Sequence, residues 1–388
     1  MGQFLIVSSR GCVMSNVFSP NQILAGRYEI IKYYAAGGMQ EVYIARDLAL
    51  DRTVALKTPK AGVVDRRFRR GAEMGARVVH PNVAATFDYY EDEKITFLVE
   101  EFVPGRDLAK LLDDEFYYLD PGLAAHILHH MARALNEAHR VGICHRDLKP
   151  SNIMTSGDPG VAALKLTDFG IAKLAESEIE AEMNLFDEDE STLTTSNTLL
   201  GAVPYMAPEC WVNWKAAGQP MDIWAFGCIA YQLLVGSPPF GMGRAAIFNV
   251  GRLSFTGVNL EKPKWFSTHK VTEVLEEDLW KIIQGCLALN PDDRPNASQI
   301  VEAFNLICYA STDRKVGFVS DFKINYADGG TGNFGFINDG AGESTFFHNT
   351  VFFGDQPAAR GQRVSFSRYP GVPNARCSPV LLLKPKAI

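Results

Sequence analysis

The chain has 388 residues, a formal net charge of -7, and a composition that is 47% hydrophobic and 21% charged. This composition is typical of a globular protein with about two or three domains, and the negative charge argues against bulk attraction to nucleic acid. Because the sequence contains no uncharged apolar run of the roughly 18 residues needed to cross a bilayer, we expect no membrane segment and no membrane partner.

Residues 1–26 are expected to form a disordered N-terminal extension, whose true start is either Met1 or Met14. The seven cysteines form no CxxC motif and lie mostly within apolar stretches. That usage is typical of a reducing compartment, so we expect a cytoplasmic protein without a disulfide framework or a zinc site.

Apolar residues alternate through residues 28–57, which predicts strands of a small antiparallel sheet with a turn at Gly37 and Gly38. Glycines in such a turn let the backbone approach phosphate oxygens, although an ordinary hairpin has the same pattern. Further along, residues 96–105 predict a strand and the connection after it, residues 123–141 have the apolar spacing of a buried helix, and residues 164–170 predict a strand and a turn.

The most informative run is His-Arg-Asp-Leu-Lys-Pro-Ser-Asn at residues 145–152, followed by Asp-Phe-Gly at residues 168–170. A hydroxyl nucleophile needs a carboxylate that orients it and takes its proton, and Asp147 fits that role. Asn152 and Asp168 carry oxygen ligands suited to Mg²⁺ that bridges nucleotide phosphates. The alternative, a polar loop followed by unrelated acids, does not account for so long a match in this order.

These motifs resemble those of the eukaryotic-like, Hanks-type Ser/Thr protein kinases of bacteria, and the resemblance runs from about Arg27 to Cys308. It implies an α+β, bilobal protein kinase fold at residues 27–309, with an N-lobe at 27–103 and a C-lobe at 104–309. The implied activity is transfer of the γ-phosphate of ATP, with Mg²⁺, to Ser or Thr hydroxyls of a protein substrate.

The resemblance also implies roles for individual residues. Lys149 would contact the transferred phosphate, and Lys57 would hold the α and β phosphates. Residues 101–103 would offer backbone groups to the adenine edge. The nucleotide-binding residues expected in this way are Ala35, Gly37, Gly38, Val42, Ala55, Lys57, Glu101 and Val103.

Three positions depart from the family pattern. Gly71 stands where a glutamate usually steadies the lysine, and Glu73, two positions further on, should face elsewhere on a helix. Glu100 lies beside the strand of Lys57 at a position that is customarily apolar or threonine, so we hypothesise that it becomes the partner of the lysine. The alternatives are that Glu100 turns to solvent or that the register is off by one. Ala202 replaces a threonine that commonly hydrogen-bonds the catalytic loop.

These departures leave a second function open, a weak or inactive pseudokinase scaffold that binds nucleotide, single-stranded RNA or DNA, or both.

Three further residues match the family pattern in positions that stabilise the kinase fold. By resemblance, Asp222 holds the backbone of the catalytic loop, and Arg294 pairs with Glu209.

Residues 175–190 carry eight acids and no base, and residues 191–198 then supply six hydroxyl groups. One interpretation is a flexible, solvated loop. The other is autophosphorylation, possible within a homodimer, with the phosphate drawn toward Arg146. The candidate acceptors are Thr192, Thr194, Thr195 and Thr198, together with neighbouring serines.

After Cys308, short strands rich in glycine and aromatic residues replace the helical periodicity. The runs at residues 332–337, 344–348 and 361–366 resemble the cold-shock domain, a small all-β, five-stranded barrel of the OB type, which we expect at residues 312–388. Residues 311–388 hold nine Lys or Arg and six Asp or Glu, so this region is positive while the rest of the chain is negative.

A cold-shock-like barrel implies a stacking platform for single-stranded RNA or DNA. Antiparallel pairing would place the candidate residues Phe334, Phe336, Phe346 and His348 on one face, and Phe322 is a fifth candidate near the position of a usual tryptophan. The alternative is that these aromatic residues fill a small barrel used for autoinhibition or docking.

Overall fold

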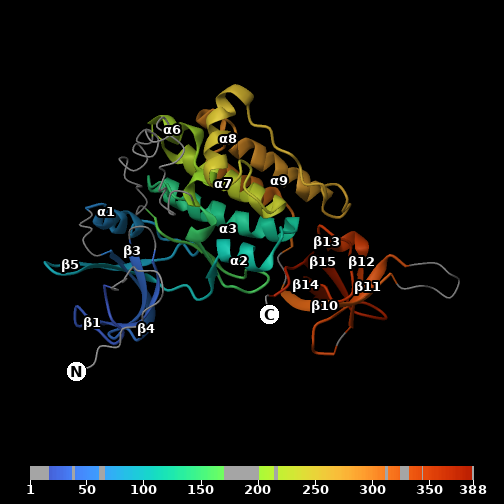
Figure 1. The fold of residues 1–388 in the computed structure, drawn as a ribbon, viewed down its shortest axis with the longest axis horizontal. Helices are drawn as coiled ribbons and strands as arrows, with labels where there is room; N and C mark the ends of the chain where they lie inside the picture. The colour runs from blue at the N-terminus through green and yellow to red at the C-terminus, as the bar shows by residue number, and fades with distance from the viewer. Residues whose placement is uncertain are drawn as a thin grey trace, which may run out of the picture. The chain divides into compact units, whose positions relative to one another are not determined.

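The computed structural model describes residues 17–36, 40–60, 66–169, 201–213, 217–310, 313–323, 332–342 and 344–386. The chain divides into two compact units, one formed by residues 1–66 and 86–102 and the other by residues 67–85 and 103–388. Figure 1 shows both units and labels many of their helices and strands. None of the helices in the described ranges combines the length and the apolarity of a membrane-spanning segment.

The first unit contains a six-stranded antiparallel sheet in the order β1-β2-β3-β4-β6-β5. One face of the sheet is buried through Tyr28, Tyr43 and Phe97, which confirms the alternation expected over residues 28–57. The strands are β1 (Ile23–Leu24), β2 (Tyr28–Ala36), β3 (Gln40–Asp47), β4 (Arg52–Pro59), β5 (Thr86–Glu91) and β6 (Thr96–Glu101).

Residues 17–26 do not form the disordered extension that we expected through residue 26. Phe18 and Leu24 are buried in the core of the sheet, and Ile23–Leu24 pairs with β2. Apolar burial therefore orders this segment, whereas residues 1–16 lie outside the described part of the chain.

The second unit is mainly helical, and α3 (Pro121–Arg140) lies at its centre, packed against α7, α9 and α10. Asp120 caps the N-terminus of α3, and Pro121 occupies its first turn, where a missing N–H costs nothing. The helix expected at residues 123–141 is confirmed. The other helices are α1 (Arg66–Gly75), α2 (Leu108–Glu115), α6 (Pro208–Asn213), α7 (Gln219–Val235), α8 (Gly243–Thr256), α9 (Glu273–Cys286) and α10 (Ala297–Leu306).

A small three-stranded sheet lies beside residues 145–152, the segment called the catalytic loop. Its strands are β7 (Arg106–Asp107), β8 (Ile153–Thr155) and β9 (Leu164–Leu166). β7 lies so close to β8 that a Cβ atom on Gly105 would overlap the carbonyl oxygen of Thr155. Only glycine fits this approach, and its φ of +138° also favours glycine. The segment before α2 is therefore held directly against the strand that follows the catalytic loop.

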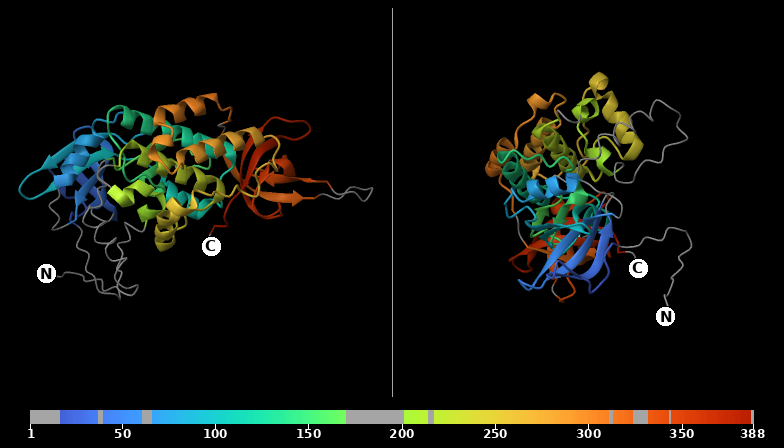
Figure 2. Two further views of the ribbon diagram at one scale, coloured as in Figure 1. Left: turned by 90° about the horizontal axis from the view of Figure 1, so that it is seen from above. Right: turned by 90° about the vertical axis from the view of Figure 1, so that its left-hand side faces the viewer.

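The C-terminal part of the second unit is a closed barrel of five strands. Neighbours around it are β12, β11, β10, β14 and β15, and a parallel pairing between β15 and β12 closes the circle. Figure 2 shows these strands beside the helices of the same unit. The strands are β10 (Arg314–Phe322), β11 (Phe334–Asn338), β12 (Ser344–His348), β14 (Arg363–Tyr369) and β15 (Arg376–Leu382), with the short β13 (Phe352–Phe353) added beside β15.

Candidate active site

In the first unit, Lys57 of β4 forms an ion pair with Glu100 of β6. The Nζ and Oε2 atoms lie 2.6 Å apart, and the two side chains are only 6% and 8% exposed. The strand register sets Ala55 opposite Glu100, two positions from Lys57, so both charged side chains project from the same face. The hypothesised partnership is confirmed, and the solvent-facing and shifted-register alternatives are wrong.

The same face of the sheet carries three other residues expected to meet a nucleotide, Ala35, Val42 and Ala55. Ala35 pairs with Val42, and Val42 pairs with Lys57, so these side chains share the face that lies opposite the aromatic core. Glu101 ends β6, and Val103 is a buried residue of the second unit. The expected Gly37 and Gly38 lie outside the described residues.

The helix α1 carries no glutamate in place of Gly71. Gly71 is buried, whereas Glu73 is exposed and pairs with Arg69 of the same helix at 3.1 Å. Glu73 therefore faces away from the buried side of α1, as its position on the helix predicted.

In the second unit, the carboxylate of Asp147 contacts the nitrogen donors of two neighbouring side chains. Lys149 Nζ is 2.7 Å from Asp147 Oδ2, and Asn152 Nδ2 donates to the same carboxylate oxygen at 2.9 Å and to the Asp147 carbonyl at 2.8 Å. Both Asp147 and Lys149 are partly exposed, at 16% and 12% of their side chains. The carboxylate is thus fixed in orientation while remaining accessible to a substrate.

Asp222 of α7 holds the backbone of this loop. Its carboxylate accepts hydrogen bonds from the N–H groups of His145 and Arg146, each at 2.8 Å, and it is 2.8 Å from His139 Nε2. Burial alone would raise the pKa of Asp222, but the hydrogen bond to His139 and the other donors bring it below its ordinary value. The expected role of Asp222 is confirmed, while His139 is a partner that the sequence did not reveal.

His145 is buried, and burial lowers the pKa of its imidazole. Its Nε2 lies 3.0 Å from the carbonyl oxygen of Thr167, and the Asp147 N–H points to its Nδ1 at 3.4 Å. A neutral ring that donates from Nε2 and accepts at Nδ1 satisfies both contacts. His145 therefore links the catalytic loop to the strand before Asp168.

Asn152 and Asp168 meet at the same end of the β8–β9 hairpin. The N–H of Thr167 donates to the Asn152 carbonyl at 3.0 Å, and the Thr167 hydroxyl donates to Asp168 Oδ2 at 3.0 Å. Asp168 has a φ of +63°, a conformation that a non-glycine residue adopts only when its surroundings impose it. Within the described ranges, no group of three His, Cys, Asp or Glu side chains forms a metal cluster.

A pocket beside the catalytic loop contains Asp147 and Ala202 in its lining. Apolar side chains form most of the rest, including Leu148, Met206 and Met221. Because Ala202 has no hydroxyl group, it offers Asp147 and Lys149 no hydrogen bond from this wall.

Arg294 binds Glu209 in a two-pronged ion pair, with N–O distances of 2.6 and 2.9 Å. The Arg294 side chain is fully buried and also donates to the Ala288 and Pro220 carbonyls. The expected pairing is confirmed, and it ties α6 to the segment that precedes α10.

On the barrel, four of the five aromatic candidates share one outer face. Phe334 is paired with His348 and Phe336 with Phe346 across β11 and β12. The ring centroids of Phe334 and Phe346 lie 5.4 Å apart, and those of Phe336 and Phe346 lie 5.9 Å apart. This set, Phe334, Phe336, Phe346 and His348, is called the aromatic face below.

Phe322 is not part of the aromatic face. Its ring stacks on the buried ring of Phe347 at 5.8 Å, and it is paired with Gly335, whose position also points inward. Two residues beside the aromatic face were missed: Arg376 lies 5.8 Å from the Phe346 ring, and Phe318 is 54% exposed. The alternation of side chains along the strand could have predicted that Phe318 points to the outer face.

The candidate phosphate acceptors Thr192, Thr194, Thr195 and Thr198 lie outside the described residues, as does Gly170 of the Asp-Phe-Gly motif.

Comparison with known proteins finds similarity over nearly the same residues as the sequence motifs. A family model described as the protein kinase domain matches residues 28–304. The chain is 35% identical over 231 residues to a probable serine/threonine-protein kinase of Corynebacterium efficiens, covering 56% of this chain and 32% of that protein. It is 31% identical to the serine/threonine-protein kinase PrkC of Bacillus subtilis, covering 72% and 40%.

A third relative, the serine/threonine-protein kinase PknB of Mycobacterium tuberculosis, is 32% identical over 70% of this chain and 41% of its own length. The chain thus spans less than half the length of these curated relatives. Among solved structures, Rad53 in complex with AMP-PNP has a TM-score of 0.53 at 23% identity, covering 72% of this chain and 66% of the other. That similarity concerns the fold.

Proposed function

Because the chain belongs to the protein kinase family, we propose that it transfers the γ-phosphate of ATP to serine and threonine hydroxyl groups of proteins. The observation that carries the proposal is the geometry of Asp147. Its carboxylate is fixed by Lys149 and Asn152, and the two residues before it, His145 and Arg146, donate their backbone N–H groups to Asp222. The names of the bacterial relatives support the choice of serine and threonine.

In this mechanism Asp147 orients the attacking hydroxyl and accepts its proton. Lys149 already lies 2.7 Å from Asp147, so its ammonium group is positioned beside the nucleophile and can contact the transferred phosphate. Lys57, held by Glu100, provides the positive charge for the phosphates that remain on the nucleotide.

The chemistry of the residues fits Mg²⁺ bound together with ATP. Asn152 uses its amide nitrogen toward Asp147, which leaves its side-chain oxygen as a ligand, and Asp168 supplies a carboxylate. When bound, the metal neutralises charge on the phosphates, which themselves complete its oxygen ligands.

The test is incubation of the protein with labelled ATP, Mg²⁺ and a general protein acceptor. We expect label on serine and threonine, and loss of at least about a hundredfold in rate for Asp147→Asn, the scale of general-base catalysis. Glu93→Gln, an equal change of charge at an exposed turn, serves as the control and should leave the rate unchanged. A wild-type protein that binds ATP without transferring phosphate would instead support the scaffold alternative.

Autophosphorylation of the threonines at positions 192, 194, 195 and 198 belongs to the same proposal. Mass spectrometry after incubation with ATP should locate phosphate on these residues in the wild type and not in Asp147→Asn. A labelling rate that rises with the square of protein concentration would indicate transfer between two copies of the chain.

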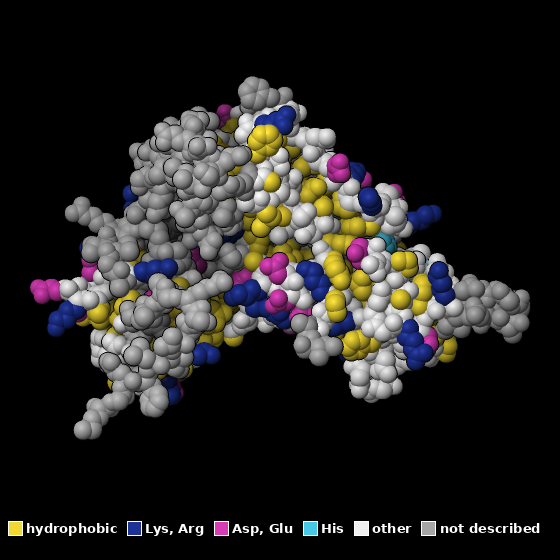
Figure 3. All heavy atoms as spheres, in the orientation of Figure 1, with side chains coloured by type: hydrophobic (Ala, Val, Ile, Leu, Met, Phe, Trp, Pro, Cys, Tyr) yellow, Lys and Arg dark blue, Asp and Glu magenta, His cyan; other side chains and the backbone are white. Residues whose placement is uncertain are grey.

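The aromatic face favours a second function for the barrel, which we propose to be binding of single-stranded RNA or DNA. The proposal is supported by the closed five-stranded barrel and by four aromatic side chains that share one surface. Stacking on such side chains contributes roughly 1 to 3 kcal/mol per base. Basic side chains on the barrel surface visible in Figure 3 are scattered, so stacking rather than phosphate attraction should dominate.

Binding of a labelled oligonucleotide across a salt series tests this second function. Phe336→Ala should weaken binding at every salt concentration, whereas phosphate contacts would add a negative salt slope near 0.7 per contact. Phe248→Ala, which removes an exposed ring from α8 outside the barrel, is the matched control for loss of an exposed ring. Absence of binding would leave the aromatic residues with a packing or docking role only.

A further inference from the structure

The outer surface of the barrel has a second face that is buried against the helices of the same unit. Phe353, Leu381 and Leu383 belong to the large helical core rather than to the core of the barrel. Leu383 also forms a β-bridge with Phe116, directly after α2. The barrel is therefore docked on the helical part of the unit, through a face that does not include the aromatic face.

Two buried ion pairs fix this docking face. Arg314 binds Asp120, the N-cap of α3, through two N–O contacts of 2.6 and 2.9 Å, with side chains 5% and 1% exposed. Arg363 binds Glu115, the last residue of α2, at 2.6 Å. Removal of Arg314 would leave the buried carboxylate of Asp120 without a cation, so this pair strongly specifies the docked arrangement.

The C-terminal strand adds contacts to the end of α2. Lys384 donates through Nζ to the carbonyl groups of Leu112 and Asp113, at 3.1 and 2.9 Å, and its backbone N–H donates to the Glu115 carbonyl at 2.8 Å. The last carbonyls of a helix have no partner within the helix and attract cations. The barrel thus adds donors to the C-terminal carbonyls of α2, beside the N–H of its C-cap residue Phe116.

A third contact lies beyond α2, at His269. Its ring stacks on Phe353 with centroids 4.0 Å apart, and its Nε2 donates to the Phe352 carbonyl at 2.9 Å. Trp265 meets the same Phe353 ring edge-on at 5.8 Å. The docking face is therefore held at separate points and cannot pivot about one of them.

Glu115 connects the barrel to the active site. The carboxylate that receives Arg363 also receives Arg106 of β7, at 3.0 Å. β7 is paired with β8, and the carbonyl of Arg106 accepts the Thr155 hydroxyl at 2.8 Å. β8 begins directly after Asn152, the proposed metal ligand.

Building on the kinase function proposed above, we propose that the docked barrel is a positioning element of the kinase. Arg363 fixes Glu115, Glu115 fixes Arg106, and β7 then holds the strand that follows Asn152. Undocking the barrel consequently weakens metal and nucleotide binding and lowers activity.

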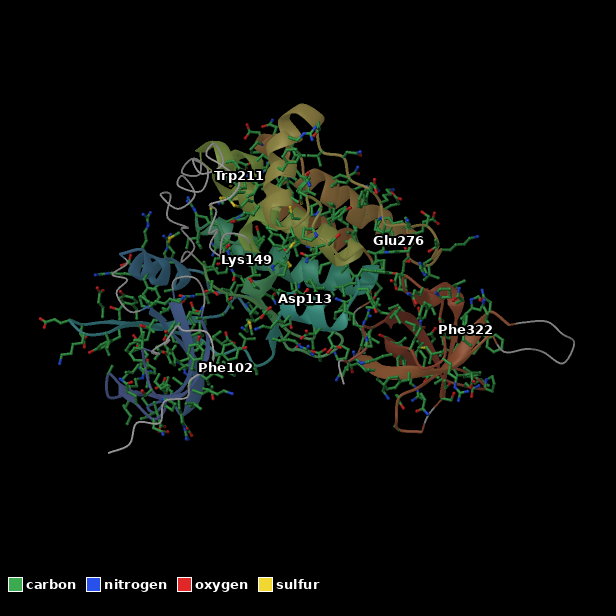
Figure 4. All side chains as sticks on the ribbon, in the orientation of Figure 1. Phe102, Asp113, Lys149, Trp211, Glu276 and Phe322 are labelled. Carbon is green, nitrogen blue, oxygen red and sulfur yellow. The ribbon has the colours of Figure 1, made fainter. Side chains whose placement is uncertain are left out.

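An inhibitory barrel would have to cover the active site or its pocket. The described contacts of the docking face instead involve α2, the start of α3 and the segment around Trp265 and His269, and none involves Asp147, Lys149 or the lining of the Ala202 pocket. Figure 4 shows Asp113 of α2 between Lys149 and the barrel residue Phe322. This placement allows the barrel to stabilise the active-site segments without covering them.

The test compares two double variants of the full chain. Arg314→Met/Arg363→Met removes both docking cations while keeping unbranched side chains of similar length. Lys315→Met/Arg360→Met removes two positive charges from exposed positions of the same barrel and is the matched control. Glu115→Gln provides an independent single change at the connecting residue.

We expect the docking variant and Glu115→Gln to exchange amide hydrogens in residues 105–107 and 153–155 at least about fivefold faster, the lower end of usual coupling between linked sites. The Mg²⁺ concentration for half-maximal rate should rise by a similar factor, with a smaller change in kcat. The control variant should match the wild type in both measurements.

Three results would overturn the proposal: faster phosphate transfer by the docking variant, unchanged exchange at both segments although the barrel is released, or equal effects in the control. Release is read from the fluorescence of Trp265, which contacts Phe353 of the barrel, taken as the difference between each protein and its Trp265→Phe counterpart because the chain has five tryptophans. If the wild type proves unable to transfer phosphate, the kinase function fails, while hydrogen exchange still decides the coupling. Should the double variant fail to fold, Glu115→Gln decides by the same exchange measurement.

Discussion

At the scale of single residues, the ion pair between Lys57 and Glu100 replaces the usual partner from a neighbouring helix. Both side chains are buried, so Glu100→Gln leaves a cation without compensation, at a cost of about 3 to 5 kcal/mol. We expect a higher KM for ATP and a lower free energy of unfolding, measured by steady-state kinetics and urea titration. Glu93→Gln is the control. Unchanged nucleotide affinity and turnover in Glu100→Met would refute the role.

This pair could be predicted because the resemblance to the kinase family places Glu100 beside the strand that carries Lys57. His139 could not be predicted as a partner of Asp222, since the two residues are 83 positions apart and meet only through the packing of α3 against α7. His139 is one of four histidines on α3, and nothing in the local sequence distinguishes it from the others. Supporting side chains that belong to the family pattern, such as Asp222, were therefore found, and His139 was not.

Ala202 lines the pocket beside Asp147 with a side chain that has no hydroxyl group. In Ala202→Thr, a hydroxyl group would stand in the same pocket as Asp147 and could hydrogen-bond the catalytic loop. One added hydrogen bond of about 0.5 to 1.5 kcal/mol predicts a two- to tenfold higher kcat. The KM for ATP should stay unchanged, because Lys57 and Glu100 are not affected. Ala202→Val, nearly equal in size, tests for a mere effect of volume, and an equal gain there would contradict the hydrogen bond.

At the scale of elements, α3 carries three histidines whose pKa values are all lowered by burial, His126, His129 and His130. Burial and the neighbouring His126 and Arg133 lower the pKa of His130 from 6.5 to about 4. The His130 ring contacts Asn82 at 3.2 Å and meets His126 edge-on at 4.6 Å. The folded protein therefore keeps this ring neutral where the unfolded chain would protonate it.

The sign of the pH effect follows from this difference. Between about pH 6.5 and pH 4 the unfolded chain binds more protons than the folded protein, so stability should fall as the pH is lowered through this window. In His130→Gln, an amide can still donate to Asn82 but cannot titrate. Urea titrations at pH 7 and pH 5 should show a smaller loss of stability in the variant, and an equal loss would assign the acid sensitivity to other groups.

A bulge in β10 explains why the prediction for Phe322 was wrong. A bulge between Val319 and Asp321 inserts a residue into the pairing with β11. Each such insertion reverses the face of every later side chain, so Phe322 turns toward Phe347 in the core. The regular strands β11 and β12 contain no bulge, and there the aromatic face predicted from the sequence is present.

At the scale of the whole molecule, the closed barrel and the resemblance to a kinase were predicted, but the docking of the barrel was not. Its main contacts join residues such as Arg314 and Asp120, which are 194 positions apart. Ionic side chains of this kind are ordinarily solvated, and nothing in the local sequence separates a docking arginine from a surface one.

Docking through buried charges also determines how the second unit should unfold. Because Phe353, Leu381 and Leu383 complete the helical core, separating the barrel would expose apolar surface on both sides of the interface together with two buried ion pairs. We therefore expect the barrel and the helices of this unit to melt in one transition. Arg314→Met/Arg363→Met should split it in two, with the change in Trp265 fluorescence preceding the loss of helical circular dichroism. Lys315→Met/Arg360→Met should keep a single transition, and a wild type that melts in two steps would show that the docked face contributes little to stability.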